Sequence, residues 1–229
     1  MPNADYTHLT VVLDRSGSMD DRITDSIGGF NAMLAEQQRL PGTCDLKVVQ
    51  FDDTFELIYD GPIAAAKSLD TTVHFARGST ALRDALGRVI LENGARFAAM
   101  AEGDRPGKVM VTVFTDGLEN SSSEFSPEAI RAMVAEHQST YSWTFVFLGA
   151  DQATALQGEE LGIANSFRYD VDTPAGNATA YAGVNRVFER ARSAAPGMNV
   201  AMSQADFQVT PDPSPDPAPQ PAPELGGEA

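Results

Sequence analysis

The sequence contains a single cysteine, Cys44, so no disulfide bond can form within the chain. Cys44 lies in an apolar stretch, where a buried and unreactive thiol is expected, and a reducing compartment suits such a residue. The first residues show neither a basic segment nor the run of about 7 to 15 apolar residues that marks a secretory signal. No segment approaches the roughly 18 consecutive apolar residues of a membrane-spanning helix. We therefore expect a cytoplasmic protein that is neither exported nor anchored in a membrane.

Basic residues are also scarce. The chain has 16 Lys and Arg against 32 Asp and Glu, which gives a formal net charge of -16. A surface of this sign repels nucleic-acid phosphates and anionic lipid headgroups. We therefore expect neither a nucleic-acid partner nor a membrane partner.

The end of the chain differs in composition from the rest. The last twenty residues hold seven of the 14 prolines and four acidic residues without a basic one, which favours polyproline II or coil over packed structure. Over the whole chain 42% of the residues are apolar, enough for the core of one domain. We predict one folded domain over residues 1–207 and a disordered, proline-rich acidic tail over 208–229.

Before this tail, short β-branched and aromatic runs alternate with longer segments of helical periodicity, the pattern of crossover units that build a mostly parallel sheet. We expect strands at residues 9–14, 45–51, 54–59, 108–115, 143–149 and 166–171. We expect helices at residues 22–39, 81–101, 127–138, 152–161 and 176–193.

Only Asp52 and Asp53 separate the second and third predicted strands, so these two strands should form an antiparallel hairpin. The fold class that follows is α/β: a doubly wound, Rossmann-like sheet of six strands, mostly parallel with one antiparallel edge strand, and helices on both faces. In such sheets ligands bind outside the carboxyl ends of the strands.

Five small oxygen-bearing side chains fall at predicted strand ends or helix starts. Asp14, Ser16 and Ser18 follow the first strand in the segment DRSGS, Thr80 precedes the second helix, and Asp116 follows the fourth strand. Two carboxylates and three hydroxyls without a His or Cys ligand suit Mg²⁺, Mn²⁺ or Ca²⁺ better than zinc or copper.

These residues resemble the von Willebrand factor type A (VWA) family, whose metal-ion-dependent adhesion site is written D-x-S-x-S followed by a distant Thr and a distant Asp. The resemblance extends in element order over about residues 5–195. It implies that Ser16, Ser18 and Thr80 contact the metal directly or nearly so. It further implies that Asp14 and Asp116 act mainly through bound waters or hydroxyls, and that a carboxylate of a partner protein takes an open coordination position.

The segments GSTAL, TDGLEN and FVFLGADQ look most similar to stand-alone intracellular VWA domains of bacteria and phages. We predict a metal-dependent protein-binding module, not an enzyme, that recognises an exposed Asp or Glu of a partner. Two alternatives stay open: a metal-assisted hydrolase of the phosphoesterase kind, and an adaptor for an AAA+ ATPase assembly.

Several residues near the predicted site also have purely structural interpretations. Ser18 and Thr80 are candidates for helix caps. Asp52 and Asp53 either form the hairpin turn, which we favour, or extend the acidic rim. Asp151 either caps the helix at 152–161, which we favour, or borders the ligand face. Arg15 is either a steering charge for an acidic partner or a solvated side chain.

Two further sets of polar residues have their own interpretations. Glu119 and Asn120 either position the water shell of a metal or occupy a solvated loop. His8, His74 and His137 share no metal-ligand spacing and are expected at the surface or at strand ends.

Overall fold

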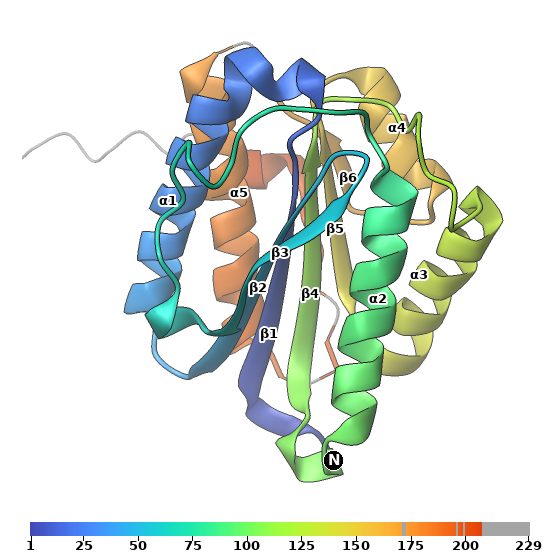
Figure 1. Cartoon of the computed structure of the whole chain (residues 1–229). Coiled ribbons are helices and arrows are strands. Elements are labelled where there is room, and N and C mark those ends of the chain that lie inside the picture. Colours follow the sequence, from blue (N-terminus) through green and yellow to red (C-terminus); the bar gives the residue numbers. More distant parts are fainter. Residues whose placement is uncertain (171–172, 196, 199, 208–229) are drawn as a thin grey trace, which may run out of the picture.

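A six-stranded sheet forms the centre of the computed structural model, which describes residues 1–170, 173–195, 197–198 and 200–207 (Figure 1). The strand order is β3-β2-β1-β4-β5-β6. All neighbouring strands pair in parallel except β2 and β3, which form the antiparallel hairpin. The predicted fold class, a mostly parallel sheet with one antiparallel edge strand and flanking helices, is confirmed. The strands are β1 (Asn3–Asp14), β2 (Thr43–Phe51), β3 (Phe55–Pro62), β4 (Pro106–Thr115), β5 (Thr144–Gly149) and β6 (Ser166–Arg168).

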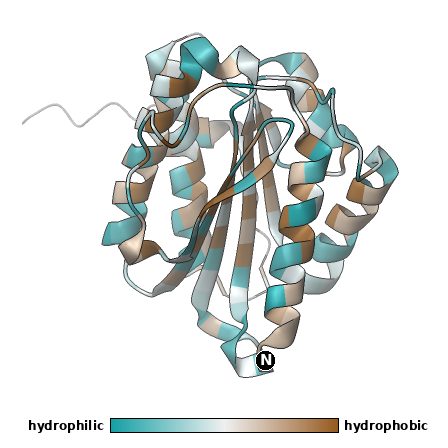
Figure 2. Cartoon of the chain, in the orientation of Figure 1, coloured by the Kyte–Doolittle hydropathy of each residue, from teal (hydrophilic) through white to brown (hydrophobic). Residues whose placement is uncertain are grey.

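Helices cover both faces of this sheet, as Figure 1 shows. One hydrophobic core lies between the sheet and the pair α1 and α5, and a second lies between the sheet and the pair α2 and α3. Figure 2 shows the apolar residues concentrated along the central strands. The helices are α1 (Ile23–Arg39), α2 (Leu82–Ala99), α3 (Pro127–Tyr141), α4 (Gln152–Glu160) and α5 (Pro174–Ser193). Short 3₁₀ segments are η1 (Gly17–Arg22), η2 (Ile63–Ala65), η3 (Glu102–Asp104) and η4 (Gln204–Phe207). Among the described residues, none of the helices combines the length and the apolar character needed to span a bilayer.

Local capping explains where several helices begin. The Ser126 hydroxyl accepts a hydrogen bond from the amide of Ala129 at 3.2 Å, and Pro127 takes the first helical position of α3. The Asp151 carboxylate accepts from the amide of Thr154 at 2.7 Å at the start of α4. Both N-caps were predicted from the sequence and are confirmed.

All six strands occur near their predicted positions, but their bounds differ. The third was expected at 54–59 and spans Phe55–Pro62. The largest differences in length concern the first and the last strand. The first was expected at 9–14 but begins at Asn3, because Asn3 pairs with Pro106 of β4 and the residues from Tyr6 onward pair with Thr43 and the residues after it in β2. The last was expected at 166–171 but ends at Arg168, because its neighbour β5 ends at Gly149, the partner of Arg168. Residue 171 and the predicted tail, 208–229, lie outside the described residues.

Two histidines are buried, contrary to prediction. His8 and His74 are both 0% exposed. The His8 ring makes an edge contact with Phe97 in the middle of the core, and burial lowers its pKa to about 3. His74 Nδ1 lies 2.8 Å from the Gln50 side-chain oxygen, and burial lowers its pKa to about 4. Both rings are therefore neutral and belong to the core.

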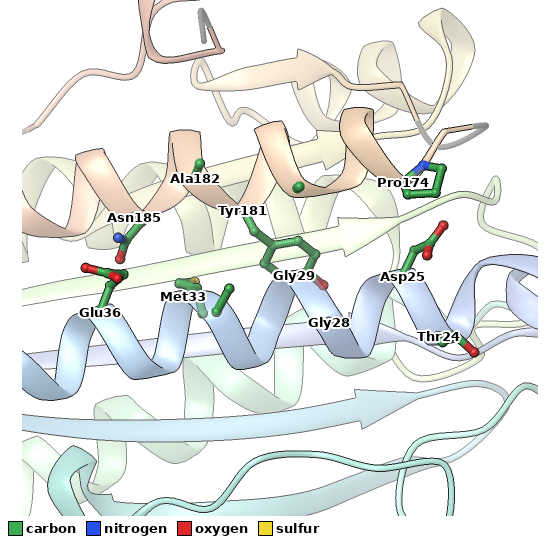
Figure 3. A pocket seen from close by; sticks show the side chains of 12 residues that line it. Thr24, Asp25, Gly28, Gly29, Met33, Glu36, Pro174, Tyr181, Ala182 and Asn185 are labelled. Atoms are coloured by element: carbon green, nitrogen blue, oxygen red, sulfur yellow. The ribbon is translucent and has the colours of Figure 1, made fainter. Parts of the chain in front are cut away.

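The packing of α1 against α5 depends on a glycine. Figure 3 shows Tyr181 of α5 facing Gly29 of α1 at a pocket between the two helices. The Tyr181 ring stacks on Phe114 with centroids 4.1 Å apart, and its hydroxyl lies 2.9 Å from the Ser26 hydroxyl. A Cβ atom at Gly29 would lie 2.2 Å from the Tyr181 ring, so only glycine fits there.

We predict that Gly29→Ala lowers the free energy of unfolding by about 1–3 kcal/mol, because the added methyl group forces Tyr181 out of its packed position. The neighbouring Gly28→Ala is the matched control. A Cβ at Gly28 meets nothing within 4 Å, so this variant should gain about 0.5–1 kcal/mol from helix propensity. Urea denaturation measures both values, and equal stabilities of the two variants would contradict the packing argument.

Candidate metal centre

The carboxyl ends of β1 and β4 lie side by side, since Leu13 pairs with Phe114 in the sheet. Asp14, the last residue of β1, is buried. One oxygen of its carboxylate accepts a hydrogen bond from the amide of Ser16 at 2.7 Å, and the other accepts from the Thr115 hydroxyl at 2.5 Å. Asp14 thus shapes the loop that carries the two serines and joins it to the end of β4.

The two serines and Asp116 meet beside Asp14. The Ser18 hydroxyl donates to Asp116 Oδ1 at 2.6 Å and lies 3.1 Å from the Ser16 hydroxyl. Two backbone hydrogen bonds hold Thr80 against the loop that follows Asp116. The Thr80 amide donates to the Asn120 side-chain oxygen at 2.9 Å, and the Thr80 carbonyl accepts from the Asn120 amide at 3.1 Å. Side chains from three separate segments of the chain therefore meet at one rim.

Gly117 shows how closely the three hydroxyls approach each other. A Cβ atom built on Gly117 would lie 3.1 Å from Thr80 Oγ1, 3.5 Å from Ser18 Oγ and 3.8 Å from Ser16 Oγ. Three neutral oxygen donors therefore surround a small space that a larger residue would fill. Such a donor set, with Asp14 and Asp116 next to it, fits a hard divalent cation.

The capping interpretations of these hydroxyls are wrong. Helix α2 begins after Ala81 rather than after Thr80, and no side chain caps it. The 3₁₀ segment η1 begins after Ser16, also without a side-chain cap. Among the residues that the structure describes, no three His, Cys, Asp or Glu side chains form a group able to hold a metal. A cation at this rim would therefore depend on the hydroxyls.

A buried ion pair holds the serine loop in place. The guanidinium of Arg15, which is 1% exposed, donates to Asp52 Oδ2 at 3.0 Å and lies 2.5 Å from Glu56. Arg77 Nε donates to the same Asp52 oxygen at 2.6 Å. Both interpretations of Arg15 from the sequence are therefore wrong, because its side chain points inward.

Asp52 also forms the turn that was predicted for it. Its second oxygen accepts from the amide and the hydroxyl of Thr54, each at 2.7 Å. Although burial opposes ionisation, the hydrogen bonds from Arg77 and Thr54 hold the pKa of Asp52 well below its usual range. This carboxylate is thus a permanent negative charge between the two arginines.

Backbone hydrogen bonds join the serine loop to the loop before Thr80. The Arg77 amide donates to the Arg15 carbonyl at 2.8 Å, and the Gly17 amide donates to the Gly78 carbonyl at 3.1 Å. Gly78 has φ +69°, a left-handed conformation that favours glycine. The sequence analysis missed the role of Arg77, because an arginine three residues before Thr80 shows no periodicity and no motif.

Glu119 and Asn120 have structural roles that neither earlier interpretation described. Asn120 positions Thr80, as described above. The Glu119 carboxylate accepts from the amides of Arg83 and Ser122 at 2.9 Å and 2.7 Å, so it joins the loop after β4 to the start of α2.

Comparison with solved structures identifies the architecture. A von Willebrand factor type A protein from Catenulispora acidiphila aligns with a TM-score of 0.56 at 17% identity, covering 80% of this chain and 42% of that one. The fold is that of a von Willebrand factor type A domain. The vWF domain of the type V pili tip protein Mfa5 from Porphyromonas gingivalis aligns with a TM-score of 0.57 at 12% identity, covering 81% of this chain and 96% of that one.

A third structural neighbour is the pilus adhesin SpaC from Lactobacillus rhamnosus GG. It aligns with a TM-score of 0.58 at 14% identity, covering 80% of this chain and 31% of that one. The chain thus spans less than half the length of the Catenulispora and Lactobacillus proteins. No protein-family model matches the sequence, and no curated protein matches it. The likeness to the VWA structures therefore concerns the fold.

Within this VWA fold, Asp14 carries the most perturbed carboxylate of the rim. Burial raises its pKa to about 6, against the opposing effect of its hydrogen bonds from Thr115 and Ser16. The nearby charge of Asp116 makes a smaller contribution to this rise. An ionised Asp14 therefore costs stability at neutral pH unless a positive charge lies next to it.

We predict that, in chelator, Asp14→Asn is more stable than the wild type by about 1–3 kcal/mol at pH 8, because it removes this buried charge. The folded pKa lies above that of an unfolded Asp, so protonation stabilises the native state, and the difference between the proteins should shrink as pH falls through about 6. Urea denaturation of both proteins between pH 8 and pH 5 measures it. A difference that stays constant over this range would contradict the prediction.

Proposed function

We propose that this chain is a protein-binding module that holds one divalent cation at its rim and uses it to bind an Asp or Glu side chain of a partner protein. The observation that carries this proposal is the convergence of Ser16, Ser18 and Thr80 around one small space beside Asp116. Ser16, Ser18 and Thr80 would hold Mg²⁺, Mn²⁺ or Ca²⁺, and Asp14 and Asp116 would act through its bound water molecules.

The charge of the chain makes such a cation useful. With a net charge of -16 the surface repels an acidic partner at a distance. Neutral hydroxyl ligands leave most of the charge of a divalent cation uncompensated, so the cation would attract a carboxylate as a further ligand. The rim would thus be a positive point on an acidic surface.

Two of the structural neighbours support a binding role, since one is named as a pilus adhesin and the other as a pili tip protein. A cytoplasmic location is also proposed here. It is supported by Cys44, which is a free and buried thiol whose pKa burial raises to about 11. Such a thiol is unreactive.

The hydrolase alternative ranks lower. It requires a carboxylate that is free to attack or to take up a proton. Both oxygens of the buried Asp14 accept hydrogen bonds, one from Ser16 and one from Thr115, so Asp14 is engaged in structure. We therefore propose that the chain is not an enzyme. The adaptor hypothesis stays a prediction from resemblance.

We predict that Mg²⁺ or Mn²⁺ raises the melting temperature of the wild type but not of Thr80→Val, which keeps the shape of the side chain and removes its hydroxyl. A cation that binds only the native state adds about 2.7 kcal/mol of stability at 100 times its Kd. Thr112→Val is the matched control, because the buried Thr112 hydroxyl of β4 has no hydrogen-bond partner within the part of the chain that the structure describes. Thermal melts in a cation series and in chelator measure the response, and an equal response of Thr80→Val and the wild type would refute the assignment of Thr80.

The partner side of the proposal has its own test. A random peptide library selected on the immobilised wild type in Mg²⁺ should become enriched in Asp or Glu at one position, and this enrichment should disappear in chelator and on Thr80→Val. Enrichment that is the same with and without cation would contradict recognition through the metal.

A further inference from the structure

Arg22 lies at the rim of the candidate metal centre without belonging to its motif. Its Nη1 donates to Asp116 Oδ2 and to the Ser18 carbonyl, each at 3.1 Å. The Arg22 side chain is 30% exposed, whereas the Asp116 side chain is 2% exposed. The guanidinium therefore contacts Asp116 from the solvent side, next to the residues that would hold the cation.

Arg22 joins two helical segments. It is the last residue of η1 and directly precedes α1, with helical dihedral angles of φ -115° and ψ -10°. The ion pair with Asp116 therefore joins the start of α1 to the residue that follows β4.

We propose that Arg22 is a second positive charge of the rim, which weakens binding of the divalent cation and strengthens binding of the carboxylate that follows. This inference rests on the proposed function. Arg22 and a cation would both draw on the charge of Asp116, and like charges repel at such short range, so Arg22 opposes cation binding. A carboxylate that bound the cation would come near this guanidinium, and a guanidinium forms charge-assisted hydrogen bonds with a carboxylate.

Arg22 is expected to weaken cation binding and to strengthen carboxylate binding. Because these two effects have opposite signs, they can be distinguished from a purely structural role of Arg22. A variant that merely loosened the rim would weaken both the cation and the carboxylate. Loss of the Arg22 charge should instead tighten the cation and weaken the carboxylate.

The first measurement is calorimetric titration of Mn²⁺ into the wild type, Arg22→Gln, Arg22→Lys and Arg39→Gln. An exposed ion pair is worth up to about 1 kcal/mol, so Arg22→Gln should bind Mn²⁺ about fivefold more tightly. Arg22→Lys keeps the charge and should stay near the wild type. Arg39→Gln removes the same charge at the other end of α1, about 25 Å away along the helix axis, and should not change Mn²⁺ binding at about 0.1 M salt.

The second measurement is a titration of acetate into the Mn²⁺-loaded proteins. Water proton relaxation monitors the titration, because acetate replaces a metal-bound water molecule. Acetate should bind several-fold more weakly to Arg22→Gln than to the wild type, Arg22→Lys or Arg39→Gln.

Equal Mn²⁺ affinity of Arg22→Gln and Arg39→Gln would overturn the inference, as would weaker Mn²⁺ binding or unchanged acetate binding by Arg22→Gln. If Arg22→Gln does not fold, the Mn²⁺ affinity of Arg22→Lys tests the inference. Since Arg22→Lys keeps the positive charge, a fivefold difference between its Mn²⁺ affinity and that of the wild type would contradict a role of charge. Failure of the proposed function gives a different result. In that case the wild type would bind no Mn²⁺, or would bind Mn²⁺ with the same affinity as Thr80→Val.

Discussion

The geometry of the candidate site depends on the ion pairs that the buried Asp52 carboxylate forms with Arg15 and Arg77. Neither arginine is a candidate metal ligand, but Arg15 lies between two candidate ligands, and Arg77 lies just before Thr80. One negative charge therefore holds two loops together. Because removing one member of a buried ion pair leaves the other charge uncompensated, this arrangement resists separation of the loops.

The sheet supplies the other half of the site. Since β1 and β4 are parallel neighbours, the residues that follow them meet at the same edge. Asp14 and Asp116 come to this edge by topology, whereas Ser16, Ser18 and Thr80 come to it by loop conformation. The left-handed Gly78 and the small Gly117 allow these loops to approach each other closely.

The elements with strong periodicity could be predicted from the sequence. The buried runs of β4 and β5, the antiparallel pairing of β2 with β3, and the N-cap at Ser126 are local signals, and the structure bears them out. The hairpin turn was expected to hold only Asp52 and Asp53, but it holds three residues, because β3 begins at Phe55, the partner of Phe51. The amino-terminal half of β1 could not be predicted, because its residues are polar and its pairing with β2 is distant in sequence.

For the candidate site, the motif residues were found through a resemblance to VWA domains, but the residues that support them were not. Arg15 and Asp52 are 37 residues apart, and Arg22 and Asp116 are 94 apart. A charged residue in a loop is usually solvated, so only the fold reveals that Arg15 points inward.

The central claim is that side chains from three segments of this chain hold one cation. The most direct measurement is the anomalous scattering of Mn²⁺ in crystals grown with that ion. The account predicts one strong peak at bonding distance, about 2.0–2.3 Å, from the hydroxyl oxygens of Ser16 and Ser18 and next to Thr80. A peak elsewhere on the molecule, with these hydroxyls bound to no ion, would contradict it.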